Sequence, residues 1–225
     1  MSTDERPGRI AATYDTIATD YAESLRDELG GKPLDRALLA AVVEMCDHGT
    51  IADLGCGPGH VTRHLASIGA DALGIDISPA MIAIAEHDAP DVRFEVASMT
   101  DLALPDESLG GVVMFYSIIH LSPGERARAF SEVHRVLRSG GIALVAFHIR
   151  SEEFAPGETN HMHTWFGHSV DIDGYFLEPE QVIDEIADAG LDVVSVTTRL
   201  PHPGIEVASE RAYVLAQKPG PTTEP

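Results

Sequence analysis

A glycine-rich segment, residues 51–60 (IADLGCGPGH), restricts the fold of this chain more than any other stretch. A short apolar run leads into three glycines, Gly55, Gly57 and Gly59, and an amphipathic segment follows them. Glycine accepts positive φ angles and lets a ligand approach the backbone more closely than a Cβ would allow. This order predicts a strand, a ligand-binding turn and a helix.

A second apolar run, residues 72–75, ends at Asp76, which follows Gly57 by 19 residues. A carboxylate at the end of the second strand, about 20 residues after a glycine turn, is placed to accept hydrogen bonds from both hydroxyls of a ribose. The two segments together therefore predict a βαβ unit that binds a nucleoside.

The spacing of the glycines bears on which nucleoside is bound. Dinucleotide sites carry G-x-G-x-x-G, with a pyrophosphate above the helix N-terminus. Here the spacing is G-x-G-x-G, and Asp53 lies two positions before the first glycine. An acidic residue there would repel a pyrophosphate and would suit the ammonium and sulfonium groups of a cationic ligand. A nicotinamide or flavin site, and a glycine turn that only joins a strand to a helix, remain as alternatives.

The motif D-L-G-C-G-P-G, followed by G-I-D-I-S, resembles motif I of the class I S-adenosylmethionine (SAM)-dependent methyltransferases, in the small-molecule branch with methyltransferase-11/25-like domains. The resemblance implies an α/β, Rossmann-like three-layer sandwich. Its seven-stranded, mostly parallel sheet would have an antiparallel strand seven between strands five and six, with an N-terminal helical lid. One domain over residues 1–225 is expected, with a lid (10–46), a SAM-binding core (47–149), an acceptor loop (150–175) and a C-terminal helix and strands (176–217).

The resemblance also implies SAM as the cofactor and a set of residues that contact it. Tyr14 and Tyr21 lie on one helix face in a Y-D-x-I-A-x-x-Y pattern that resembles a lid helix, although a packed aromatic stripe is an alternative. Ser98 and Met99 occupy the adenine-binding positions, where Ser98 departs from the family's usual acidic residue. The expected cofactor contacts are Tyr14, Tyr21, Asp53, Gly55, Cys56, Gly57, Gly59, Asp76, Ile77, Ser98, Met99 and Tyr116.

Periodicity and turn residues predict the remaining elements. Helices are expected at residues 10–29, 33–46, 60–68, 80–87, 122–137 and 178–189, and strands at 50–54, 72–75, 92–96, 106–117, 142–147, 191–198 and 211–217. Residues 1–9 and 219–225 are expected to be mobile. Residues 150–173 show little periodicity and are expected to form an irregular acceptor-binding stretch.

Methyl transfer to a hydroxyl group calls for a base, and histidine is the usual choice near neutral pH. His120 follows strand four and is the candidate base, with a packing role as the alternative. The candidate acceptor-binding residues are Tyr14, His120, Arg150, His161, His163 and Trp165, with Arg150 suited to an anionic acceptor. His161 and His163 resemble a metal pair, but no further ligand spacing completes a site, so no metal is expected.

Composition narrows the possible partners. The chain has 36 acidic and 15 basic residues and a formal net charge of −21, which leaves no basic surface for nucleic acid or anionic lipid. Two cysteines do not make a disulfide framework, and no apolar run reaches about 18 residues. We therefore expect a cytoplasmic protein, a monomer or homodimer, with a small-molecule or peptide acceptor.

The resulting hypothesis is a SAM-dependent methyltransferase that acts on a small molecule, with oxygen slightly favoured over nitrogen as the methyl acceptor. Two alternatives stay open. One is a nicotinamide-dependent oxidoreductase, and the other is a SAM-binding protein that does not transfer the methyl group.

Overall fold

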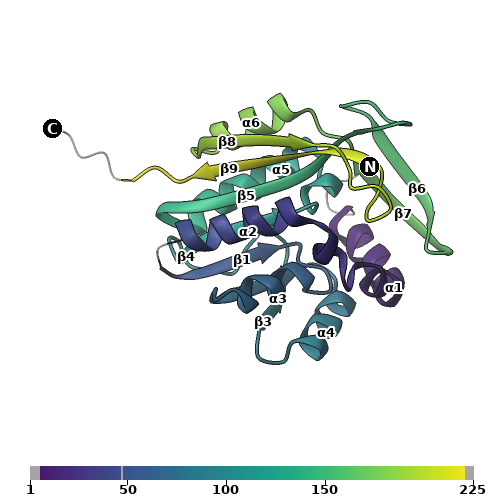
Figure 1. Cartoon of the computed structure of the whole chain (residues 1–225), viewed down its shortest axis with the longest axis horizontal. Helices are drawn as coiled ribbons and strands as arrows, with labels where there is room; N and C mark the ends of the chain where they lie inside the picture. The colour runs from purple at the N-terminus through teal and green to yellow at the C-terminus, as the bar shows by residue number, and fades with distance from the viewer. Residues whose placement is uncertain (1–5, 47, 221–225) are drawn as a thin grey trace.

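A seven-stranded sheet forms the centre of the computed structural model, which describes residues 6–46 and 48–220 (Figure 1). The strand order is β3-β2-β1-β4-β5-β9-β8. The strands are β1 (Thr50–Leu54), β2 (Ala72–Asp76), β3 (Arg93–Val96), β4 (Leu109–Phe115), β5 (Leu137–Ser151), β8 (Asp192–Arg199) and β9 (Ser209–Gln217). Strands β1 to β5 pair in parallel, while β9 is antiparallel to both β5 and β8. The predicted fold class, including the inserted antiparallel strand, is confirmed.

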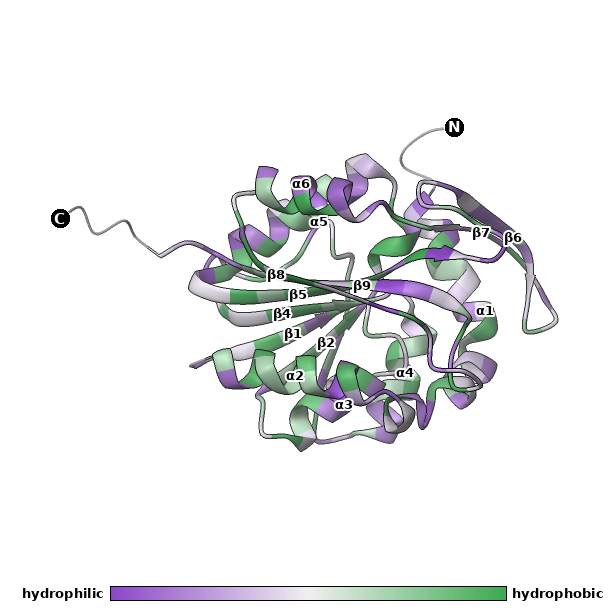
Figure 2. Ribbon diagram, turned by 45° about the horizontal axis from the view of Figure 1, so that its top comes forward, coloured by the Kyte–Doolittle hydropathy of each residue, from purple (hydrophilic) through white to green (hydrophobic). Residues whose placement is uncertain are grey.

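Helices cover both faces of the sheet (Figure 2). Buried side chains of α5 and α6 pack on one face, and those of α2 and α3 pack on the other. The helices are α1 (Arg6–Leu25), α2 (Pro33–Met45), α3 (His60–Ser67), α4 (Pro79–Asp88), α5 (Pro123–Val136) and α6 (Pro179–Asp188), with 3-10 turns η1 (Glu28–Gly31) and η2 (Ile118–His120). In the part of the chain that the structure describes, no helix is long and apolar enough to cross a membrane.

The central parallel strands β1, β2 and β4 are mostly apolar and buried because helices cover them on both sides. In β1, for example, Ile51 is 2% exposed and Ala52 and Leu54 are fully buried. The helix starts follow from local chemistry as well. The Ser78 hydroxyl accepts a hydrogen bond from the Met81 N–H at the start of α4, and Pro79 occupies the first turn, as the sequence predicts.

The N-terminal helix α1 begins and ends earlier than predicted, at residues 6 and 25 instead of 10 and 29. Residues 6–9, expected to be mobile, form the first turn of α1, where Arg6 and Arg9 form ion pairs with Asp173 and Asp171. These partners lie more than 160 residues away along the chain, so no local pattern reveals them. Residues 1–5 and 221–225 lie outside the described part of the chain.

The stretch expected to be irregular is instead a β-hairpin, formed by β6 (Thr159–Trp165) and β7 (His168–Tyr175). Its two-residue turn, Phe166–Gly167, has positive φ at both positions, as a type I′ turn requires. Phe is an unusual first residue for this turn, which hides the hairpin in the sequence. The buried alternation of Val170 and Ile172, which pack against α1, is the signal that could have identified it.

Strand β5 is also longer than predicted. Residues 138–141, between the expected helix and strand, lie within β5, which begins at Leu137, and the ladder with β4 shifts register there. At its other end, β5 continues past the predicted limit of Phe147 because β9 pairs with it as far as Ser151.

Candidate active site

Two adjoining cavities lie at the carboxyl ends of the central strands, where the order of a doubly wound sheet reverses beside β1. We call them the first and second cavity. The glycine loop and the ends of β2 and β4 line the first cavity. The lid helix α1, the β6–β7 hairpin and residues of β5 and β9 contribute to the second. Tyr14, Tyr21, His60, Phe115, Tyr116 and His120 line both cavities and form the junction between them.

The glycine loop presents bare backbone to the first cavity. Gly57 has a φ of 52°, and a Cβ there would meet only the Tyr21 ring, at 3.7 Å. A Cβ at Gly55, by contrast, would come within 2.3 Å of the Ser117 Cβ. The first glycine therefore allows the loop to pack against the chain that follows β4, and the second leaves room for a ligand.

Asp76 holds this loop in place from the end of β2. It is 8% exposed, and its two carboxylate oxygens each accept a backbone N–H, from Gly57 and from Ser78, both at 2.8 Å. Burial raises the pKa of Asp76, while the backbone donors oppose that shift. The carboxylate lines the cavity and retains free lone pairs, so it can accept further hydrogen bonds from a hydroxylated ligand.

Asp53 lies behind the loop rather than in the cavity lining. Its carboxylate is 1% exposed and accepts a hydrogen bond from the Thr62 hydroxyl at 2.7 Å. Burial raises the pKa of Asp53 to about 6. The direct contact with a cationic ligand that the sequence analysis expected for Asp53 is absent from this geometry, since the side chain connects β1 to α3.

Four other expected cofactor contacts, Cys56, Ile77, Ser98 and Met99, do line the first cavity. The Ser117 hydroxyl lines it too, and its buried oxygen has no hydrogen-bond partner among the described residues. A cavity with bare glycine backbone, a carboxylate and an unpartnered hydroxyl fits a ligand rich in polar groups, such as a nucleoside carrying an amino acid.

His120 and Tyr14 form a hydrogen-bonded pair at the junction. His120 is 5% exposed, its Nδ1 lies 2.7 Å from the backbone oxygen of Asp173, and its Nε2 lies 2.7 Å from the Tyr14 hydroxyl. Because a carbonyl only accepts, Nδ1 carries the proton and Nε2 accepts from Tyr14. Burial lowers the pKa of His120 and raises that of Tyr14 well above its usual value. Both groups are therefore neutral near pH 7.

Aromatic side chains surround this pair. Tyr14, Tyr21 and Trp165 contact one another edge to face, with ring centroids 5.4–5.7 Å apart. Trp165 lines the second cavity, as the sequence analysis expected for an acceptor-binding residue, whereas the predicted cofactor contact Tyr116 lines both cavities.

Three predicted acceptor residues lie outside both cavities. Arg150 has a side chain that is 59% exposed and pairs with Glu210 at 3.1 Å. His161 and His163 are exposed on the opposite face of β6 from Met162, which lines the second cavity, because successive strand residues alternate. His161 instead binds Asp173 at 2.6 Å. Within residues 6–46 and 48–220, no three His, Cys, Asp or Glu side chains are grouped to hold a metal ion.

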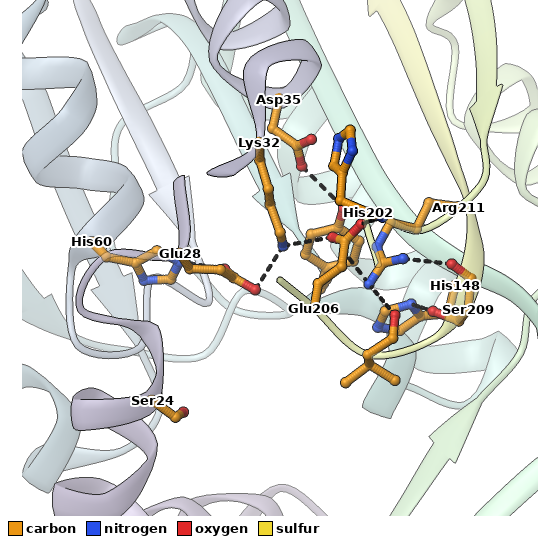
Figure 3. A network of polar contacts seen from close by, with 12 residues as sticks. Ser24, Glu28, Lys32, Asp35, His60, His148, His202, Glu206, Ser209 and Arg211 are labelled. Atoms are coloured by element: carbon orange, nitrogen blue, oxygen red, sulfur yellow. Dashed lines mark hydrogen bonds and ion pairs between the residues drawn. The ribbon is translucent and has the colours of Figure 1, made fainter. Parts of the chain in front are cut away.

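Sequence reasoning missed a polar network on one wall of the second cavity, which Figure 3 shows. Lys32 and Arg211 line this wall, and both are only 1% exposed. His148 lies beside Arg211, and the Ser209 hydroxyl contacts its Nδ1 at 2.7 Å. These residues come from α2's N-cap and from β5 and β9, so only the folded sheet brings them together.

Comparison with known proteins agrees with this geometry. Residues 51–141 match the family described as "Methyltransferase domain". A demethylmenaquinone methyltransferase of Renibacterium salmoninarum is 28% identical over 147 residues, which are 64% of this chain and 61% of that protein. A probable S-adenosylmethionine-dependent methyltransferase of Mycolicibacterium smegmatis is 34% identical over 112 residues, 50% of this chain and 42% of that protein. This chain thus spans about three-fifths or less of the length of these two relatives.

Among solved structures, the Burkholderia thailandensis 1,6-didemethyltoxoflavin-N1-methyltransferase, determined with 1,6-didemethyltoxoflavin and S-adenosylhomocysteine, is similar in fold. The TM-score is 0.75 at 18% identity, and the alignment covers 97% of this chain and 91% of that one. Residues 51–141 therefore match a methyltransferase domain, and the whole chain shares the fold of a SAM-dependent methyltransferase. S-adenosylmethionine is the cofactor that these comparisons support.

Proposed function

We propose that this protein transfers the methyl group of SAM to a small molecule, with oxygen slightly favoured over nitrogen as the acceptor atom. The observation that supports this most directly is the junction itself: the cavity at the glycine loop and an aromatic cavity share the hydrogen-bonded pair of Tyr14 and His120. A methyl donor in the first cavity would meet an acceptor in the second beside a neutral imidazole.

The proposed cofactor contacts are those that line the first cavity. Asp76 would accept hydrogen bonds from the ribose hydroxyls, and the backbone at Gly57 would lie against the amino-acid end of the ligand. Ser98 and Met99 would border the adenine, with Ser117 supplying a further polar contact. When bound, SAM supplies an electrophilic methyl group, and the sulfur leaves as a neutral thioether.

The residues at the junction would position the acceptor and move one proton. An acceptor hydroxyl would give its proton to the Tyr14 oxygen as the Tyr14 proton passes to Nε2 of His120. The Asp173 carbonyl holds the proton on Nδ1, which keeps Nε2 free to receive. Much of the acceleration would come from holding the reacting atoms in line, while the lid and hairpin exclude water.

The same proposal covers the organisation and location of the chain. We infer that the chain forms one domain, which is divided into a lid, a core and a C-terminal segment. The hairpin β6–β7 is the acceptor loop of this domain. A cytoplasmic location and a monomeric or homodimeric state remain predictions from the sequence.

The first experiment is calorimetric titration of the protein with SAM, S-adenosylhomocysteine and NADH in parallel. Micromolar binding of the first two and none of NADH is expected. Acceptors are then screened by the formation of S-adenosylhomocysteine and by the mass of the product. Binding of NADH alone, or of nothing, would contradict the proposed cofactor site. Binding of SAM with no methylated product from any acceptor class would favour a SAM-binding protein that does not transfer the group.

A further inference from the structure

The second cavity has a wall with two buried cations, Lys32 and Arg211, and the neutral imidazole of His148 beside them; we call these three residues the basic wall. This is unusual in a chain with a net charge of −21. Burying a cation costs free energy unless partners compensate for the lost water, so two cations at 1% exposure on a cavity wall need an explanation.

Carboxylates pair with these cations, and Asp35 pairs with Arg199 beside them, but only Glu28 of these carboxylates lines the cavity. Glu206 is shared, lying 3.1 Å from the Lys32 ammonium and 3.2 Å from the Arg211 guanidinium while it also pairs with Arg199. Neither Glu206 nor Arg199 lines the cavity. Among its lining residues only Glu28 carries a carboxylate, and Glu28 is held by Lys32 at 2.6 Å and by His60 at 3.5 Å.

Arg211 also has unused hydrogen-bonding capacity. Its terminal nitrogens donate to the backbone oxygens of Ser209 and Val207, but its Nε is buried and has no partner among the described residues. A buried N–H without an acceptor is costly, and a ligand oxygen would remove that cost. Burial, and then the charges of Arg211 and Lys32, lower the pKa of His148 to about 3, so its imidazole is neutral.

The ring of Tyr116, which is part of the junction, connects the junction to the basic wall. His148 stacks on Tyr116 with ring centroids 4.9 Å apart, and Tyr116 lines both cavities. The Lys32 ammonium is 5.1 Å, and the Arg211 guanidinium carbon 5.6 Å, from the centre of the Tyr116 ring. The rest of the cavity is largely apolar and aromatic, with Phe115, Ile119, Met162, Trp165 and Phe176 in its lining.

We propose that the methyl acceptor is an aromatic acid, whose oxyanion binds Arg211 and Lys32 while its accepting atom lies beside Tyr14 and His120. The proposal rests on the function proposed above and names the substrate class for the same site. A flat apolar body fits the aromatic lining, and a carboxylate or phenolate oxygen fits the unpartnered Arg211 Nε. The anion-binding role that the sequence suggested for Arg150 thus passes to Arg211.

Binding can be read from fluorescence, because Trp165 is the only tryptophan in the chain and lines the cavity. The protein loaded with S-adenosylhomocysteine is titrated with three matched pairs: benzoate and benzamide, salicylate and salicylamide, 1-naphthoate and 1-naphthamide. We expect the acids to bind about tenfold more tightly than the amides, as a charge-assisted contact predicts. Titration of 1-naphthol above and below its own pKa separates phenolate from carboxylate recognition.

Variants then assign the preference to the basic wall. Arg211→Gln should reduce the preference for acids about tenfold, Arg211→Lys should retain part of it, and Arg150→Gln, an exposed arginine outside the cavity, should leave it unchanged. Lys32→Gln provides a second test if Arg211→Gln does not fold. Equal affinity for acids and amides, or no binding of any acid, in a protein that binds S-adenosylhomocysteine would overturn the proposal and leave the proposed methyltransferase function standing. Failure to bind S-adenosylhomocysteine would count against that function instead.

Discussion

At the scale of single residues, burial decides what the ionisable side chains of the site can do. Asp53 and Asp76 are both acidic, buried and close to the glycine loop, yet Asp76 lines the cavity and Asp53 does not. His120 is neutral because burial lowers its pKa, and its proton is placed on Nδ1 by a backbone carbonyl. Residue type alone therefore does not define a role; the neighbours of the side chain do.

Replacing Asp76 should weaken cofactor binding. Asp76→Ala removes a charged acceptor for the ribose and releases the Gly57 and Ser78 amides, so we expect a loss of about 1–3 kcal/mol in SAM affinity. Calorimetry measures this loss, and Asp71→Ala, at the exposed amino end of the same strand, serves as the control. Unchanged affinity in Asp76→Ala would refute the ribose assignment.

The His120–Tyr14 pair predicts a pH profile. His120→Ala should lower turnover about 10²–10⁴-fold with SAM affinity nearly intact, and Tyr14→Phe should also be slow. The pKa of His120 lies below its usual 6.5, so the wild-type rate should stay level above that pH and fall as pH drops through the lowered pKa. Initial rates from pH 5 to 9 test this. A fully active His120→Ala enzyme at every pH would exclude His120 from the mechanism.

At the scale of elements, the lid helix α1 is tied to the cofactor side of the sheet and to the hairpin. Asp15 accepts hydrogen bonds from the Ser78 hydroxyl at 2.6 Å and from the Ala80 N–H at 3.1 Å, at the start of α4. On its other side α1 pairs with β7 through Arg6 and Asp173. Helix α1 therefore links α4 to the hairpin, and Figure 1 shows α1 beside α4.

Breaking the Asp15 contacts should loosen the lid. Asp15→Ala removes an acceptor at the N-terminus of α4, worth about 1 kcal/mol, so amide exchange over residues 6–25 should be roughly five- to tenfold faster. Hydrogen exchange with mass spectrometry measures this rate. Glu23→Ala, at an exposed position of the same helix, should leave it unchanged. Equal exchange in both variants would show that Asp15 does not hold the lid.

At the scale of the whole molecule, the charges on the surface differ from those on the wall of the second cavity. A net charge of −21 leaves most basic residues paired with acids, and it opposes nucleic acid as a partner. The positive charges of Lys32 and Arg211 are concentrated on a buried wall instead.

Global stability should depend on pH through His148. Its pKa is about 3 in the folded protein and about 6.5 when unfolded, so below pH 6.5 the unfolded chain binds the proton and stability falls. When the pH is lowered from 8 to 5, the free energy of unfolding of the wild type should fall by about 1–2 kcal/mol more than that of His148→Asn. Urea denaturation at both pH values measures the difference. His87→Asn, an exposed histidine of α4, is the control, and an equal change in all three proteins would contradict the prediction.

The sequence by itself determined the strands of the main sheet, the place of its antiparallel last strand and the cofactor loop. Glycine spacing and strand periodicity are local patterns, and the resemblance of D-L-G-C-G-P-G to the methyltransferase motif carried the antiparallel last strand with it. Asp76, Ser98 and Met99 lie where that motif implied, in the lining of the first cavity.

The tertiary structure alone decided the acceptor side. Arg211 became part of the basic wall because β9 pairs with β5 in the register that puts Arg211 opposite His148, 63 positions apart along the chain. Alternation on β6 turned His161 and His163 away from the cavity that Met162 lines, and the register shift between Met162 and Thr164 brought Trp165 back to it. Such contacts depend on the pairing of segments that are far apart in the sequence. No local pattern specifies the register of that pairing or the face on which each side chain lies. The cofactor loop, by contrast, is built from one contiguous stretch.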